Sequence, residues 1–271
     1  MGDMRDHGKR NILGILVNAI DYDAAVHQII GAAEEGRGFA VTALAVHGIM
    51  TGVQDQAHRY RLNQFDLVTP DGQPVRWALN LLHRTPLPDR VYGPTLALRV
   101  CAAAAEKGLP VYFYGSRQDI LDRMIQNHRE RFPKLKIAGA SPSRFGRTTL
   151  KEKSEIAERI RASGAKITFV GLGCPRQEVF AYEYRELLSM PVIAVGAAFD
   201  YHAGSLNEPP PVIQQAGLQW LYRLTQDPRR LWKRYLLLNP AFLTLLALQT
   251  LQLWRPDPSA ATQPTGELLY G

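Results

Sequence analysis

Residues Lys166–Leu188 read KITFVGLGCPRQEVFAYEYRELL and contain, in this order, a short apolar run, two glycines and a segment of helical length. The run does not alternate between apolar and polar residues, which is typical of a strand covered by helices on both faces. The glycines allow a tight turn, and Pro175 suits the first turn of a helix. The stretch therefore predicts a strand at 166–171, a glycine turn and a helix at 175–188.

This succession of strand and helix repeats along the chain. Strands are expected at 11–17, 39–45, 65–69, 110–115, 135–140, 166–171 and 191–196. Helices are expected near 22–35, 53–63, 73–83, 94–107, 117–131, 148–163 and 175–188. The rhythm predicts a Rossmann-like α/β fold, with a mostly parallel sheet and helices on both faces. In such sheets a nucleotide binds in the crevice at the carboxyl ends of the strands.

The character of the chain changes after residue 205. Three consecutive prolines occupy 209–211, and the segment that follows is helical, basic and aromatic, without strand signals. We expect an α/β core at 1–205, a basic amphipathic helical appendage at 206–255 and a disordered tail at 256–271, which is rich in proline, alanine and threonine.

The appendage is expected to contain two helices that are separated at Asp227-Pro228, because aspartate suits an N-cap and proline suits the first helical position. By their spacing, Arg230, Lys233 and Arg234 share one helix face, while leucines and aromatic residues share another. This pattern favours binding to a membrane surface with anionic lipid. The alternative is that the apolar face packs on the core and the cations are only solvated.

The overall charge of the chain also favours binding to anionic partners. The 271 residues include 32 Lys and Arg against 25 Asp and Glu, which gives a net charge of +7 and a pI near 9.5. Such an excess favours anionic partners, namely phosphates, acidic lipid or nucleic acid. We disfavour nucleic acid, because basic and aromatic residues gather in the appendage and no nucleic-acid-binding module is evident.

The cellular compartment is indicated by three features. Cys101 and Cys174 are too few for a disulfide framework, so a reducing compartment is expected. The first residues, MGDMRDHGKR, lack the apolar run of a signal peptide. The segment 236–254 comes closest to a membrane span, but polar residues and a proline interrupt it. We expect a cytoplasmic protein that is peripheral on the inner face of the cytoplasmic membrane.

Two polar residues near strand ends are candidates for chemistry. Asp71 follows a strand and precedes Gly72 and a helix, so its carboxylate is expected to face the crevice. Thr42 lies near the same edge of the sheet. The alternatives are that Asp71 only serves the turn or caps the helix, and that Thr42 only favours a strand.

Two glycine turns after later strands are candidates for ligand binding. Their residues are Gly115, Ser116, Gly171, Gly173, Arg176 and Gln177. Glycine lets the backbone approach a ligand closely, and the N–H groups at the start of a helix can hold an anion. The alternative is a purely structural turn, because Gly-x-Gly alone is a weak signal.

We expect neither a metal site nor a cofactor. The triplet Asp21-Tyr22-Asp23 has the Asp-x-Asp form that can hold a divalent cation, but it opens an expected helix, where capping is the favoured interpretation. The chain has no Gly-x-Ser-x-Gly, His-Glu-x-x-His or paired Cys-x-x-Cys motif, which argues against a serine hydrolase and a zinc enzyme.

Four segments, taken in order, resemble the WecG/TagA/CpsF family, glycosyltransferase family 26, over nearly all of 11–238. They are TPDGQPVRWAL, GLGCPRQE, VGAAFDYHAG and GLQWLYRLTQDPRRLWKRYL. The resemblance implies an inverting hexosyltransferase that moves a sugar from a UDP-sugar to an undecaprenyl-diphosphate-linked acceptor in the synthesis of a bacterial cell-surface polysaccharide or exopolysaccharide.

The resemblance also implies residue roles. Asp71 would be the base, Thr42 a supporting site residue, and the surroundings of Gln177 would contact the donor. The appendage arginines that would cover the lipid diphosphate or anchor the protein are Arg223, Arg229, Arg230 and Arg234.

The sequence departs from the family at Leu44 and Val46, where the family usually has Asn and often an acidic residue. This leaves a plain hexose and an N-acetylhexosamine open as the transferred sugar. Two rival functions are a non-catalytic membrane-associated protein of polysaccharide assembly and a nucleotide-dependent oxidoreductase. The second would need Gly-x-Gly-x-x-Gly after the first strand, where this chain has VNAIDYD. A homo-oligomer is also compatible with the sequence.

Overall fold

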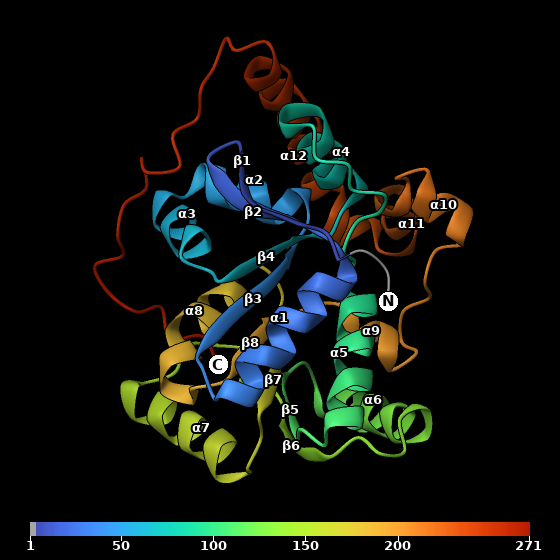
Figure 1. Ribbon diagram of the computed structural model, residues 1–271, viewed down its shortest axis with the longest axis vertical. Coiled ribbons are helices and arrows are strands. Elements are labelled where there is room, and N and C mark those ends of the chain that lie inside the picture. Colours follow the sequence, from blue (N-terminus) through green and yellow to red (C-terminus); the bar gives the residue numbers. More distant parts are fainter. Residues whose placement is uncertain (1–3) are drawn as a thin grey trace.

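The computed structural model describes residues 4–271, except for the side chains of residues 211, 230 and 234. Its centre is a parallel sheet of six strands in the order β4-β3-β8-β7-β5-β6 (Figure 1). These strands are β3 (Phe39–Leu44), β4 (Leu67–Pro70), β5 (Val111–Gly115), β6 (Ile137–Ser141), β7 (Ile167–Gly171) and β8 (Pro191–Ala194). The predicted parallel α/β fold is confirmed.

Helices cover both faces of this sheet (Figure 1). On one face lie α1 (Tyr22–Glu35), α5 (Gly93–Lys107), α6 (Gln118–Arg131) and α9 (Ala198–His202). On the other face lie α2 (Val46–Gln54), α3 (Gln56–Asn63), α7 (Leu150–Ala162) and α8 (Arg176–Leu188). Successive residues of β7 belong to opposite apolar clusters, Phe169 to the first and Val170 to the second. Burial on both faces explains why the strands are continuously apolar.

The expected single strand at 11–17 is wrong. The chain forms an antiparallel hairpin of β1 (Asp6–Ile12) and β2 (Ile15–Ile20), which pairs outside the main sheet. Two residues join the strands, Leu13 with φ of 54° and Gly14 with φ of 89°. Positive φ at both residues of such a short loop is what a tight hairpin turn requires.

The expected single helix at 53–63 is also wrong. Two helices, α2 and α3, meet at Asp55, whose side chain accepts a hydrogen bond from the His58 N–H at 3.0 Å. Asp55 therefore caps the start of α3 and interrupts the helix pattern. The start of α2 at Val46 and the whole of the short helix α9 were not expected from the sequence.

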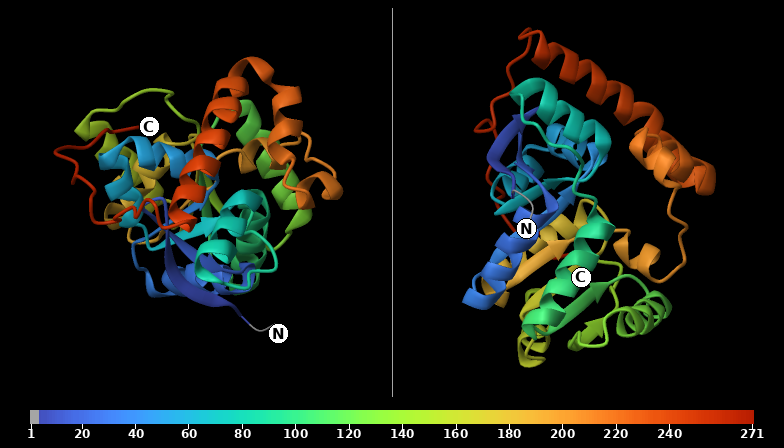
Figure 2. Two further views of the ribbon diagram at one scale, coloured as in Figure 1. Left: turned by 90° about the horizontal axis from the view of Figure 1, so that it is seen from above. Right: turned by 45° about the vertical axis from the view of Figure 1, so that its right-hand side comes forward.

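The appendage consists of α10 (Pro211–Gln215), α11 (Gln219–Gln226) and α12 (Pro228–Thr250). The predicted break at Asp227-Pro228 is confirmed, whereas α12 continues through Pro240 without ending. Figure 2 shows α12 lying across one end of the molecule next to α4 (Gln73–His83). None of the helices in the described part of the chain is long and apolar enough to span a membrane.

The tail at 256–271, expected to be disordered, instead lies against the core. The Thr148 N–H donates to the Leu269 carbonyl at 2.6 Å, and Arg147 forms an antiparallel bridge with Tyr270. The Ser143 hydroxyl donates to the Gly271 carbonyl at 2.9 Å. Disorder was expected because the tail is rich in proline, alanine and threonine, but its backbone finds hydrogen-bond partners on the surface of the core.

Candidate active site

The carboxyl ends of the parallel strands and the appendage enclose a cavity of about 830 Å³. Parallel α/β sheets bind ligands in this position. The residues expected from the sequence that line it are Asp71, Gly72, Ser116, Gly171, Gly173, Arg176, Gln177 and Arg223. Thr42, Gly115 and Arg229 do not line it, and the side chains of Arg230 and Arg234 lie outside the described part of the structure.

Asp71 is placed at the cavity by the end of β4 and the start of α5. Its N–H donates to the Leu44 carbonyl at 3.2 Å, and its Oδ1 accepts a hydrogen bond from the Gly93 N–H at 2.9 Å. Gly93 begins α5, and the first N–H groups of a helix are favourable partners for a carboxylate. Gly72, and not Asp71, is the N-cap of α4, so the alternative of Asp71 as the cap of that helix is wrong.

Thr42 does not line the cavity, but it contacts a residue that does. Its side chain is fully buried, and its hydroxyl donates to Oε1 of Glu178 at 3.1 Å. The Gln177 amide donates to the same oxygen at 2.9 Å and accepts from the Gly173 N–H at 3.1 Å. Thr42 therefore positions Glu178, and Gln177 also closes the glycine turn. Burial raises the pKa of Glu178 above its usual range.

The two glycine turns lie side by side. Gly115 and Gly171 are partners in the register of β5 and β7, and the Ser116 N–H donates to the Gly171 carbonyl at 2.9 Å. Gly115 has a φ of +116°, and a Cβ atom there would come within 2.7 Å of the Gly171 carbonyl oxygen. Gly115 thus shapes the turn from behind, while Ser116 and Gly171 reach the cavity.

The appendage supplies the opposite wall, including Trp220, Arg223 and Lys233. Burial by itself would lower the pKa of Arg223, but nearby tyrosines and the Asp71 carboxylate raise it, so the guanidinium stays charged. A cation on this wall faces the side of the cavity that carries Asp71 and the glycine turns. The cavity therefore combines one carboxylate with groups that can hold an anion.

Sequence reasoning missed Arg90 and Glu178, which both line the cavity. Arg90 is 6% exposed, stacks over the Tyr92 ring at 4.4 Å and donates to Gln214 at 2.9 Å and to Gln219. It thereby ties the core to the appendage. Arg90 lies outside every motif that the sequence analysis singled out, whereas Glu178 ends the segment GLGCPRQE but was given no role there.

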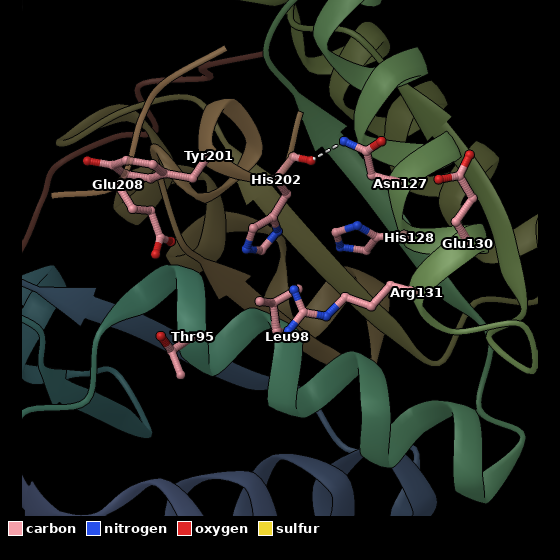
Figure 3. A pocket seen from close by; sticks show the side chains of 9 residues that line it. All are labelled: Thr95, Leu98, Asn127, His128, Glu130, Arg131, Tyr201, His202 and Glu208. Carbon is pink, nitrogen blue, oxygen red and sulfur yellow. Dashed lines mark hydrogen bonds between the residues drawn. The ribbon is translucent and has the colours of Figure 1, made fainter. Parts of the chain in front are cut away.

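A second cavity of about 770 Å³ lies between α5, α6 and α9 (Figure 3). The rings of His128 and His202 lie next to each other there, with centroids 5.0 Å apart and planes tilted by 45°. Burial lowers the pKa of His128 to about 4 and that of His202 to about 3, so both rings are neutral near pH 7. None of the residues expected in the site lines this cavity, and we place the candidate active site in the first one.

The Asp-x-Asp triplet lies away from the candidate active site. Asp21 is the N-cap of α1 and accepts from the Ala24 N–H at 2.9 Å, while Asp23 pairs with Arg99. Neither aspartate lines the cavity, so the capping interpretation is confirmed for Asp21.

Comparisons with known proteins give one family. A sequence model described as the glycosyl transferase WecG/TagA/CpsF family matches residues 10–256. The N-acetylglucosaminyldiphosphoundecaprenol N-acetyl-beta-D-mannosaminyltransferase of Bacillus spizizenii is 32% identical over 199 residues, which are 73% of this chain and 74% of the relative. The Bacillus subtilis protein of the same name is 28% identical over 195 residues, which are 72% of this chain and 73% of the relative.

Proposed function

We propose that this chain, which belongs to the WecG/TagA/CpsF family of glycosyltransferases, transfers a sugar from a UDP-sugar to an acceptor carried on a polyprenyl diphosphate. The names of both relatives describe such a lipid-linked acceptor, N-acetylglucosaminyl-diphospho-undecaprenol, and this supports the same class of acceptor here. The dimensions and polarity of the cavity agree with a bound nucleotide sugar, since small-molecule sites usually measure about 300–1,000 Å³.

The observation that carries the proposal is the position of Asp71 opposite groups that can hold a diphosphate. Asp71 takes the proton from an acceptor hydroxyl while that oxygen forms a bond to the anomeric carbon of the donor. The bond from this carbon to the nucleotide diphosphate breaks, and the configuration inverts. The leaving diphosphate is stabilised by N–H groups at the start of α8 and by the Arg223 guanidinium.

The test is the replacement Asp71→Asn, which keeps the shape of the side chain and removes the base. We expect kcat to fall by about 10²–10⁴-fold, the usual contribution of a general base. Asp21→Asn is the matched control, because Asp21 also accepts a hydrogen bond at a helix start but lies outside the cavity. Near-normal turnover by the Asp71 variant would remove this residue as the base.

For the transferred sugar we propose N-acetylmannosamine, the sugar in the names of both relatives. A plain hexose is the second candidate, because Leu44 lines the cavity where the family usually has an amide side chain. Leu44 packs against Gly48 and offers no hydrogen bond to an acetamido group. Incubation of each UDP-sugar with a lipid-linked N-acetylglucosamine acceptor, with mass detection of the product, distinguishes the two sugars.

We further propose that the segment 206–255 is the unit that holds the enzyme on the inner face of the cytoplasmic membrane, with 1–205 as the catalytic core. On α12, Leu236 and Leu237 are 55% and 61% exposed, and Arg229 and Lys233 are exposed on the same helix. Exposed apolar side chains with nearby cations are the composition of membrane-surface helices. Another face of α12 packs on the core through Phe242 and Leu246, whereas Leu243 is 59% exposed like Leu236 and Leu237.

Vesicle sedimentation tests this attachment. Replacement of Leu236 and Leu237 by serine should weaken binding to anionic vesicles about tenfold or more, because each leucine contributes roughly 1 kcal/mol when it enters the interface. The control is Leu150→Ser, since Leu150 is also exposed, at 66%, but belongs to α7 of the segment 1–205 and not to the appendage. Equal vesicle binding by the double variant and the control would overturn the assignment of α12 as the membrane contact.

A further inference from the structure

The Glu178 side chain is almost fully buried below the glycine turn of β7. One of its carboxylate oxygens has hydrogen-bond partners and the other has none among the described residues. Oε1 accepts hydrogen bonds from Thr42 and Gln177. Oε2 is buried without a hydrogen-bond partner among the described residues. A buried carboxylate oxygen without a partner is costly, so it indicates that something else satisfies it.

His58 presents a second unsatisfied atom at the same place. The residue lies in the first turn of α3 and is 2% exposed, and its Nε2 is buried without a hydrogen-bond partner. An imidazole nitrogen without a hydrogen-bond partner in the protein can serve as a ligand of a metal ion.

Cys174 completes the set. Its side chain lies beside the Glu178 carboxyl and borders the cavity. His58, Cys174 and Glu178 each bring one ligand atom to a common point, and these atoms all lie within 4.8 Å of one another. The three residues come from α3, from the turn after β7 and from α8.

We propose that His58 Nε2, Cys174 Sγ and the Glu178 carboxylate form a binding site for a divalent transition-metal ion of the zinc class. Nitrogen, sulfur and carboxylate ligands together match the preference of zinc. A tetrahedral zinc ion with bonds of about 2.0–2.3 Å holds its ligand atoms roughly 3.3–3.8 Å apart, so no pair would have to approach by more than about 1–1.5 Å.

The charges and the surroundings fit this ion. A thiolate and a carboxylate together neutralise a divalent cation, and the thiol proton leaves for solvent when the ion binds. Thr42 and Gln177 orient the carboxylate from behind through Oε1, as residues around metal ligands commonly do. Glu178 and Cys174 both line the cavity, so the proposed ion would lie next to the candidate active site.

No metal site was expected from the sequence, because His58 lies far along the chain from Cys174 and Glu178 and the three residues match no spaced metal motif. The inference rests on the geometry of the three side chains and stands independently of the proposed sugar transfer. The ion would fix the turn from Gly173 to Gln177, which forms part of the cavity wall.

Cobalt titration of the full chain, stripped of metal with a chelator, tests the proposal. We expect one Co²⁺ per chain, with a thiolate-to-cobalt charge-transfer absorption and strong visible bands typical of tetrahedral cobalt, all of which added Zn²⁺ removes. Cys174→Ser should abolish the charge-transfer absorption, and His58→Gln should weaken Co²⁺ binding at least tenfold. Thr42→Val should weaken it about 10–100-fold through the orientation of Glu178.

Cys101→Ser is the matched control, because Cys101 is the other cysteine of the chain and is buried in α5. This variant should keep the charge-transfer absorption at full intensity. Cys174→Ala, compared by circular dichroism with the unaltered protein, separates loss of the ligand from loss of the fold. Absence of Co²⁺ binding, binding without a charge-transfer band, or an unchanged band in folded Cys174 variants would each overturn the site.

Discussion

Gly115→Ala tests whether the two neighbouring glycine turns depend on each other. Gly115 has a φ of +116°, and an added Cβ would meet the backbone of Gly171 at 2.7 Å from its oxygen and 2.8 Å from its carbonyl carbon. Gly171 cannot move aside, because the Phe199 ring lies on it and its carbonyl accepts from Ser116. The new methyl group therefore has to displace backbone and not a flexible side chain.

The expected loss of stability has two parts. A positive φ at a non-glycine residue costs about 1–2 kcal/mol. Overlap with a packed neighbour costs about 1–3 kcal/mol more. The free energy of unfolding should therefore fall by about 2–5 kcal/mol. Gly164→Ala is the matched control, since Gly164 has a φ of +78° with no atom within 4 Å of an added Cβ, so only the first part applies.

Urea unfolding followed by circular dichroism measures the stability of both variants, and the KM for the proposed UDP-sugar donor reports on the Gly171 turn. We expect Gly115→Ala to lose clearly more stability than Gly164→Ala and to raise the KM, because the Gly171 turn lines the cavity. If both variants lost the same free energy, the contact between the two turns would contribute nothing and the reasoning would be refuted.

Two further predictions concern stability. Burial lowers the pKa values of His128 and His202 from 6.5 to about 4 and about 3, so between pH 6.5 and 4 the unfolded chain binds protons that the folded chain does not. Urea unfolding at several pH values should therefore show that the free energy of unfolding decreases as the pH is lowered, by about 1.4 kcal/mol per pH unit for each histidine. The slope should be shallower in His128→Asn. Glu267→Gln should cost about 1–3 kcal/mol by urea unfolding, because Lys153, 6% exposed, loses the carboxylate that pairs with it; an unchanged value would show that the pair contributes nothing.

Much of the sheet could be predicted because burial on both faces leaves a clear local pattern. Strands such as β7 are continuous apolar runs, and glycine follows them where the chain turns. The hairpin was missed because its turn has Leu13, a residue that rarely adopts positive φ. The contacts of the tail were missed because its composition indicates only how readily the segment orders by itself, and not which surface of the core it can bind.

In the candidate site, the residues at strand ends were predictable and their partners were not. Asp71 and the glycines after β7 follow directly from where strands stop. Glu178 was missed because it looks like an ordinary helical glutamate until Thr42, 136 residues earlier, is placed beside it. Arg90 likewise finds its partner Gln214 at a separation of 124 residues. Such pairings depend on the topology, which no local pattern encodes.

The contact between the tail and the wall of the cavity has a consequence for the order of folding. The segment 143–148, which carries Phe145 at the cavity, is held by Leu269, Tyr270 and Gly271. On the ribosome these residues emerge after the whole sheet and the appendage have been synthesised. The sheet can therefore form while translation continues, whereas this part of the cavity wall takes its final form only after the sheet, so a nascent chain gains its scaffold before the complete wall of the candidate site.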